Sequence, residues 1–205
     1  MAYRNGTYVA FHADGTNIPG GKSDIDYYYL MKAWSASDGT EFNMINCHEK
    51  ASAVRDGSLR ATLRASLLER LSNSKNMVLI VGETTRFDTD WVPLEIEKAV
   101  DGYQIPIIVA YTMYSGAVRK PSAFSGYWPA ALSSRISNGT ASVIHVPFKQ
   151  APLHDAIEQF SHNYLFHAHK TPSRLTRILL TLGSVRKRHT PYRQARPQRL
   201  LAASS

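Results

Sequence analysis

The chain has few of the features that would place a protein outside the cell or in a membrane. It has a single cysteine, Cys47, which excludes an internal disulfide and fits a reducing compartment. Its longest apolar runs, such as Met77 to Val81, are much shorter than the roughly 20 residues that cross a bilayer. The opening residues show no signal-peptide pattern. We therefore predict a cytoplasmic protein.

Acidic residues are absent from the last part of the chain. Residues 165–205 hold nine of the 24 Lys and Arg residues and none of the 16 Asp and Glu residues. Residues 1–164 are therefore nearly neutral, which gives no electrostatic reason to expect nucleic acid there. We predict a folded domain over residues 1–164 and a basic C-terminal segment over 165–205, with a helix followed by a disordered tail. Binding of nucleic acid or an anionic membrane by this segment remains open.

Several common catalytic and binding motifs are also missing. Gly15 and Gly21 are separated by five residues, whereas a P-loop requires four. No G-x-S-x-G sequence supports a serine hydrolase. A phospho-acceptor receiver would need an Asp where the third expected strand ends in Gly82. Three clustered histidines lack a Cys or acid at matched spacing, so no metal site is expected at His162, His167 and His169.

Strand-like and helix-like segments alternate along the rest of the chain. We expect strands at residues 7–12, 42–47, 76–81, 105–111 and 143–148. We expect helices at residues 24–34, from 58 onward, at 91–101 and at 152–164. The strands are apolar on both faces, which is typical of a parallel sheet covered by helices on both sides. This spacing predicts a flavodoxin-like α/β fold with five strands in the order 2-1-3-4-5. Residues 112–140 show no clear period, and we interpret them as a long connection with short helical turns.

The predicted strand order locates a ligand crevice beyond the carboxyl ends of strands 1 and 3. The loops Phe11 to Lys22 and Gly82 to Asp90 border this crevice. We expect Asp90 to cap the next helix, where Trp91 and Glu95 are four residues apart and so share a face. The expected core stripe of this helix leaves Glu95 at its edge rather than beneath it: Val92, Ile96, Ala99 and Val100.

Two residues near the crevice each have two interpretations. Glu95 is either a solvated helix glutamate or a functional carboxylate. Cys47, at the end of the second expected strand, is either a small buried apolar side chain or a thiol that lines the mouth of the crevice. The sequence pattern alone does not decide between them.

Three segments of the chain carry a resemblance to a known family. They are residues 8–14 (YVAFHAD), 46–49 (NCHE), and 78–85 (VLIVGETT) followed by Trp91-Val92-Pro93-Leu94-Glu95-Ile96. Together they resemble the TIR domain superfamily, and more narrowly the TIR-like subunit of the bacterial Thoeris antiphage system, over about residues 7–160. Pro93 and the glycine-rich loop from residue 15 to 22 depart from the usual pattern.

The resemblance implies cleavage of the nicotinamide–ribose bond of NAD+, with Glu95 as the catalytic residue. NAD+ would be the substrate, so no separate cofactor is expected. Members of the family release ADP-ribose, cyclic ADP-ribose isomers or a histidine adduct, and in Thoeris this nucleotide signal activates a separate effector protein after phage infection. We expect substrate contacts from five further residues: Phe11, His12, Asp14, Cys47 and Trp91.

The family also contains an alternative without catalysis. A TIR domain can act as an interaction scaffold that assembles through its loops, and the intact Glu95 after Trp91 argues against this alternative. An enzyme that consumed NAD+ continuously would harm its host. We therefore expect low resting activity until a phage-derived trigger or homo-oligomer assembly orders the loops at Gly15 to Lys22 and His48 to Gly57.

Overall fold

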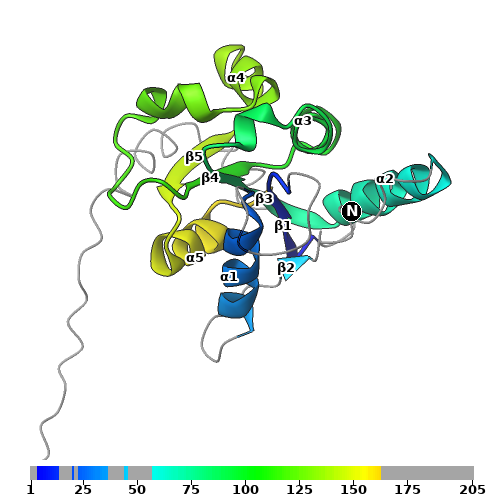
Figure 1. The fold of residues 1–205 in the computed structure, drawn as a ribbon, viewed down its shortest axis with the longest axis horizontal. Coiled ribbons are helices and arrows are strands. Elements are labelled where there is room, and N and C mark those ends of the chain that lie inside the picture. Colours follow the sequence, from blue (N-terminus) through cyan, green and yellow to red (C-terminus); the bar gives the residue numbers. More distant parts are fainter. Residues whose placement is uncertain (1–3, 14–19, 21–22, 37–43, 46–56, 163–205) are drawn as a thin grey trace, which may run out of the picture.

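The computed structural model describes residues 4–13, 20, 23–36, 44–45 and 57–162. Four strands of five to eight residues form a parallel sheet: β1 (Gly6–Ala10), β3 (Ser74–Val81), β4 (Ile107–Tyr111) and β5 (Val143–Pro147). A two-residue strand, β2 (Met44–Ile45), pairs in parallel with β1, so the strand order is β2-β1-β3-β4-β5 (Figure 1). The predicted α/β fold with a parallel sheet and flanking helices is confirmed.

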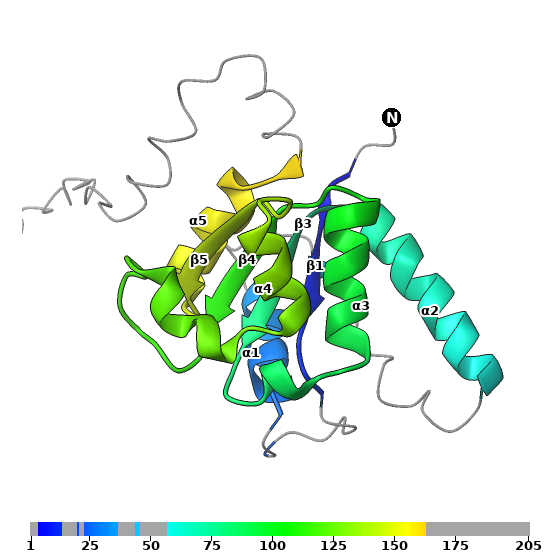
Figure 2. The same ribbon diagram turned by 90° about the horizontal axis from the view of Figure 1, so that it is seen from above.

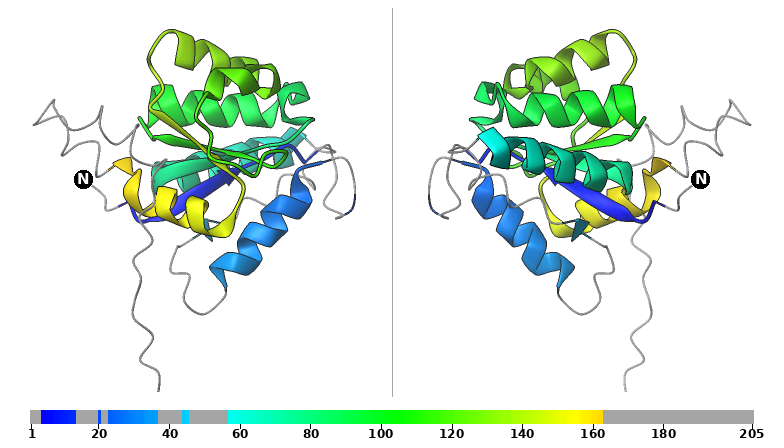
Figure 3. Two further views of the ribbon diagram at one scale, coloured as in Figure 1. Left: turned by 90° about the vertical axis from the view of Figure 1, so that its left-hand side faces the viewer. Right: turned by 90° about the vertical axis from the view of Figure 1, so that its right-hand side faces the viewer.

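Helices cover both faces of this sheet. One face carries α1 (Ile25–Ser35) and α5 (Gln150–Gln159), coloured blue and yellow in Figure 3. The opposite face carries α2 (Gly57–Ser72), α3 (Trp91–Glu97) and α4 (Ala130–Ser137), with α3 between the other two (Figure 2). Within the described part of the chain, no helix is both long enough and apolar enough to span a membrane.

Successive side chains of each strand enter different halves of the core, because side chains alternate along a strand. Tyr8 and Ala10 of β1 pack on the side of α2, α3 and α4. Val9 and the following Phe11 pack on the side of α1 and α5. The same alternation runs along β3 and β4. It decides which of the candidate site residues lie on the same face of the sheet.

The segment between β4 and β5 is more ordered than the sequence suggests. It contains a short 3-10 helix, η5 (Pro121–Tyr127), and the two-turn helix α4. Serines weaken the helix signal of α4 because their hydroxyls compete for backbone hydrogen bonds. Packing of the fully buried Leu132 against the core stabilises this helix instead. The predicted basic segment 165–205 lies outside the described residues.

The helix that carries Glu95 also departs from its expected form. Its α-helical part, α3, ends at Glu97, and the chain continues through a π-helical turn, η4 (Lys98–Gly102). The helical segment therefore extends about as far as predicted, but its second half is π-helical rather than α-helical. Within it, Val92, Ile96, Ala99 and Val100 are buried, as the expected core stripe requires.

A buried amide joins the sheet to α5. The Thr7 hydroxyl donates to Oδ1 of Asn76 at 2.8 Å. Nδ2 of Asn76 donates to the carbonyl oxygens of Ile157 and Phe160, at 2.8 and 3.0 Å. Since carbonyls at the end of a helix lack partners within the helix, Asn76 satisfies groups that would be costly to bury alone.

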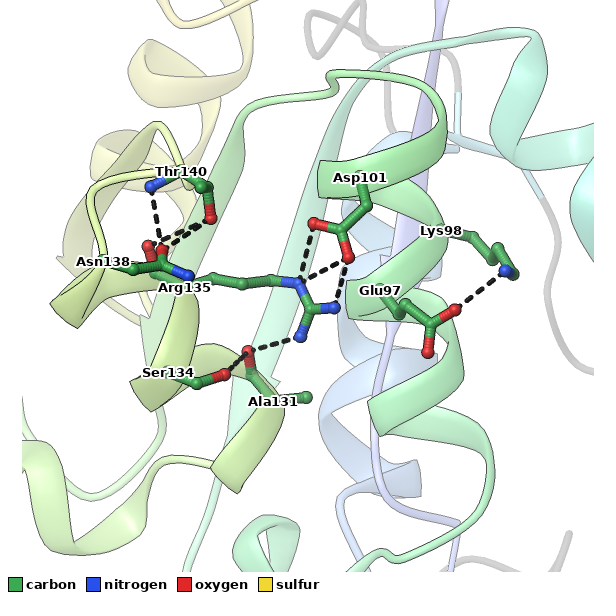
Figure 4. Close-up of polar contacts among 8 residues, drawn as sticks. All are labelled: Glu97, Lys98, Asp101, Ala131, Ser134, Arg135, Asn138 and Thr140. Atoms are coloured by element: carbon green, nitrogen blue, oxygen red, sulfur yellow. Dashed lines mark hydrogen bonds and ion pairs between the residues drawn. The ribbon is translucent and has the colours of Figure 1, made fainter.

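An ion pair holds η4 and α4 together, just before β4 begins (Figure 4). Nε of Arg135 donates to both carboxylate oxygens of Asp101, at 3.1 and 3.2 Å, and Nη2 also contacts Oδ2. Nη1 of Arg135 donates to the Ala131 carbonyl at 3.0 Å. Hydrogen bonding to Arg135 lowers the pKa of Asp101 from its ordinary value. Two nitrogens of the guanidinium therefore tie α4 to η4, and the third bonds within α4.

Replacement of Arg135 tests this connection. We expect Arg135→Met, which keeps a long side chain but removes the guanidinium, to lower the free energy of unfolding by about 1 kcal/mol near neutral pH. A depressed Asp pKa stabilises the fold above the unfolded pKa, so the difference from the parent should shrink as pH falls and Asp101 becomes protonated. Urea unfolding from pH 7 to pH 3 measures this, with the exposed Arg64→Met in α2 as the control. Equal losses in both variants would contradict the assignment.

Candidate active site

The carboxyl ends of β1 and β3 meet at a buried polar junction. The backbone N–H of Asp24 donates to the His12 carbonyl at 2.9 Å, which fixes the start of α1 beside the end of β1. The Thr85 hydroxyl donates to Oδ2 of Asp24 at 2.7 Å. The same hydroxyl accepts the Gly82 N–H at 2.7 Å. These bonds join α1, β1 and β3 at the edge where the sequence predicts a crevice.

The backbone of Gly82 lies directly against the Asp24 carboxyl group in this junction. A Cβ at this position would lie 1.9 Å from Oδ1 of Asp24, much closer than non-bonded atoms can approach. Any side chain at Gly82 would therefore displace the Asp24 carboxyl. This contact explains the glycine directly after β3, because the carboxyl group occupies the space that a side chain would need.

Asp24 is almost entirely buried, with an exposed fraction of 3%. Burial raises the pKa of its carboxyl group from 3.8 to about 6, although the Thr85 hydroxyl and the nearby His12 act in the opposite direction. Desolvation is the larger effect on the pKa because one hydroxyl and a neighbouring histidine only partly replace water around the charge. Asp24 is thus a carboxyl group that titrates close to neutral pH at the edge of the predicted crevice.

Asp88, rather than the predicted Asp90, supplies the carboxylate that begins α3. Oδ1 of Asp88 accepts the backbone N–H groups of Asp90, Trp91 and Val92, at 2.9, 3.0 and 3.3 Å. The prediction for Asp90 was wrong because its side chain forms an ion pair with Arg60 of α2. The Arg60 guanidinium also lies 5.5 Å from the centre of the Trp91 ring. Contacts with α2 therefore decide which aspartate acts as the cap.

Glu95 lies deeper than its helix pattern indicates. The sequence places it at the edge of the core stripe, but its exposed fraction is 0%. The hydroxyl of Tyr8, which is 1% exposed, donates to Oε1 of Glu95 at 2.6 Å. The expectation of an edge position was wrong because a donor on β1 reaches the carboxylate and makes its burial tolerable. Glu95 does not contact solvent in this structure.

The structure distributes the predicted substrate-binding residues over both faces of the sheet. Trp91 is partly buried and packs against the same half of the core as Tyr8. Phe11 lies on the opposite half, where its ring stacks on Tyr28 of α1 at a centroid distance of 4.7 Å. His12 lies at the Asp24 junction, where its carbonyl accepts the Asp24 N–H. Trp91 therefore shares the face of Glu95, and Phe11 does not.

Two of the predicted substrate-binding residues, Asp14 and Cys47, lie outside the described residues. Of the two loops expected to order on activation, only Gly20 and Gly57 are described. Within the described ranges, no group of three His, Cys, Asp or Glu side chains could hold a metal ion.

Three residues of this edge were not identified from the sequence as site residues: Tyr8, Asp24 and Thr85. Tyr8 reads as an ordinary aromatic strand residue, and Asp24 as a favourable acid in the first turn of a helix. A buried carboxyl group requires a hydrogen-bond donor, so the carboxyl groups indicate that a donor must exist. The sequence does not show which residue supplies it. Which donor meets which carboxyl depends on contacts over 61 and 87 positions of sequence separation.

The buried Asp24 makes the stability of the protein depend on pH. A folded pKa raised from 3.8 to about 6 means that the folded state keeps its proton longer, so stability falls as pH rises through this window. The difference corresponds to about 3 kcal/mol. Asp24→Asn keeps an oxygen for the Thr85 hydroxyl but cannot ionise, so we expect it to lack this loss. Urea unfolding of parent and variant at pH 4, 5, 6 and 7 measures the effect, and parallel profiles would contradict it.

A comparison with known families identifies the part of the chain that contains this edge. The family described as "Thoeris protein ThsB, TIR-like domain" matches residues 8–116 of the chain, more than half of its length. The match begins at Tyr8, includes the Asp24–Thr85 junction and α3 with Glu95, and ends after β4. The chain therefore belongs to the ThsB TIR-like domain family of the Thoeris antiphage defence system.

Proposed function

We propose that the protein is an NAD+-consuming enzyme that breaks the bond between nicotinamide and ribose, with Glu95 as the catalytic residue. The product would be an ADP-ribose-derived signal, such as a cyclic ADP-ribose isomer or a related adduct, that activates a separate effector in antiphage defence. The single observation that carries the proposal is the position of Glu95. It lies in the matched region, on the helix that follows the carboxyl end of β3.

The chemistry requires little beyond one well-placed carboxylate. Nicotinamide leaves as a neutral molecule, so leaving-group protonation is unnecessary. The ribose carbon passes through an oxocarbenium-like state, as in glycoside hydrolysis. A carboxylate about 4 Å from that cation stabilises it by about 4 kcal/mol at an effective dielectric constant near 20. Such stabilisation corresponds to roughly a thousandfold in rate.

The neighbourhood of Glu95 suits this chemistry in two respects. The half of the core around it is largely apolar, with Val92, Ile96 and Trp91 on its own helix. Low polarity strengthens the interaction between a carboxylate and a developing cation. The Asp88 cap and the Arg60–Asp90 ion pair fix the first turn of α3, which precedes Glu95 directly. A rigid helix start favours a precise position for the carboxylate.

The burial of Glu95 adds a condition to the proposal. A carboxylate with no exposed surface cannot touch a ribose, so turnover requires a change that opens the site. We therefore expect low basal activity in the resting protein. A trigger that binds the open state about 10,000-fold more tightly would shift it from 1% to 99% of the population.

A non-catalytic interaction scaffold is the second candidate, and the same burial favours it. A structural glutamate that serves only to satisfy a buried tyrosine hydroxyl would show the observed contact with Tyr8. In that case NAD+ levels would not depend on the carboxylate. The two candidates therefore differ in the outcome of a single substitution.

The test is Glu95→Gln, which keeps size and helix propensity but removes the negative charge. We expect NAD+ turnover to be abolished. Glu97→Gln is the matched control, because Glu97 lies on the same helix, is 46% exposed and pairs with Lys98 at 2.8 Å. It should retain turnover within threefold of the parent. Mass spectrometry of lysates from infected cells would follow loss of NAD+ and the appearance of ADP-ribose-containing species.

Two results would contradict the proposal. Turnover by Glu95→Gln within threefold of the parent would remove Glu95 from the chemistry. Unchanged NAD+ in infected cells that express the parent would favour the scaffold. Melting temperatures of both variants control for unfolding, since Glu95 is buried and Glu97 is not.

A further inference from the structure

We propose that Tyr8 is a positioning residue for the reaction of Glu95: its hydroxyl holds Oε1 of the carboxylate and thereby sets how the carboxylate meets the ribose. This inference rests on the proposed function of Glu95. Tyr8 itself does not touch the substrate in this proposal. Its role is to fix the orientation of a flexible side chain, and the argument starts from the strand that carries it.

Tyr8 belongs to an internal strand of the sheet. It lies in β1, which has a paired strand on each side, and its register partners are Ile45 in β2 and Met77 in β3. Its ring is 1% exposed and packs in the half of the core formed with α2 and α3. The backbone and the ring are therefore both fixed, so the hydroxyl has a defined position.

Glu95, by contrast, reaches its position through a longer side chain. A glutamate has three rotatable bonds, and ordering such a side chain costs conformational entropy. The bond from Tyr8 restrains the terminal carboxylate and so reduces the freedom left by those rotations. A displacement of about 1 Å at a reacting group can cost on the order of a hundredfold in rate. The restraint is therefore large enough to matter for catalysis.

The bond from Tyr8 also acts on the charge of the carboxyl group. At 2.6 Å between the two oxygens, it is a well-formed hydrogen bond from a hydroxyl to a carboxyl oxygen. A donor to a carboxyl oxygen favours the charged form of the group, whereas burial opposes it. Tyr8 thus acts in the direction that the proposed chemistry requires.

Tyr8→Phe removes the hydroxyl and keeps the ring, so it tests the restraint directly. We expect kcat for NAD+ to fall at least tenfold while KM stays within threefold of the parent. Tyr111→Phe is the matched control, because Tyr111 is also fully buried on the same half of the core. Its hydroxyl contacts Nε1 of Trp128 at 2.8 Å and Nδ1 of His145 at 2.9 Å, away from Glu95. It should keep kcat within threefold.

A second measurement tests the pair without any reference to activity. Urea unfolding of the parent, Tyr8→Phe, Glu95→Gln and the double variant forms a double-mutant cycle. We expect a coupling of about tenfold in the folding equilibrium constant. The cycle of Tyr111→Phe with Glu95→Gln should be additive within about twofold, since the Tyr111 hydroxyl contacts Trp128 and His145.

The possible results separate this inference from the proposed function. Loss of kcat in Tyr8→Phe at unchanged KM, with coupling to Glu95, supports it. If the parent is active and Tyr8→Phe is equally or more active, the positioning role is overturned and the proposed function is not. Additivity in the Tyr8–Glu95 cycle overturns the energetic coupling of the pair. An inactive parent overturns the proposed function. Coupling in that inactive parent would assign the pair a structural role only.

Discussion

The candidate active edge of this domain depends on the junction where the Asp24 carboxyl lies against the backbone of Gly82. The absence of a side chain at Gly82 lets α1 begin directly over the end of β3. The Thr85 hydroxyl then joins the two, because it donates to Asp24 and accepts from Gly82. From Thr85 the chain reaches the Asp88 cap within three residues and α3 directly afterwards. The position of Glu95 is therefore set by a series of short-range contacts that begins at this junction.

Two buried carboxyl groups flank β1 and β3, and a hydroxyl reaches each of them. Asp24 meets Thr85 next to α1, and Glu95 meets Tyr8 beneath α3. At the opposite edge, the Asp101–Arg135 pair joins helices at the surface, where a partly exposed ion pair contributes little. Buried carboxyl groups are expensive, as the raised pKa of Asp24 shows, so stability alone does not account for them. The presence of two such groups beside neighbouring strands fits a functional site.

Because Glu95 is buried, the two candidate functions of the protein differ in whether the site must open. A carboxylate sealed in the core can stabilise a cation only after the site opens, whereas a scaffold needs no opening. In this structure the Glu95 carboxyl group is fully buried and held by the Tyr8 hydroxyl. In the enzymatic case this would keep NAD+ consumption low and still leave the carboxylate correctly oriented when a trigger acts.

The sequence by itself determined the fold class, since alternating apolar strands and amphipathic helices allow few arrangements other than a covered parallel sheet. It also determined that Trp91 and Glu95 follow the third strand on one helix, because periodicity and chain order are local properties. Only the tertiary structure decided that Asp88 rather than Asp90 caps this helix and that residues 130–137 are helical. It likewise decided that Phe11 faces away from Glu95 and that Glu95 is buried beneath Tyr8. These outcomes depend on partners far away in the chain, such as Arg60 for Asp90 and Tyr8 for Glu95, and local sequence patterns contain no information about such partners.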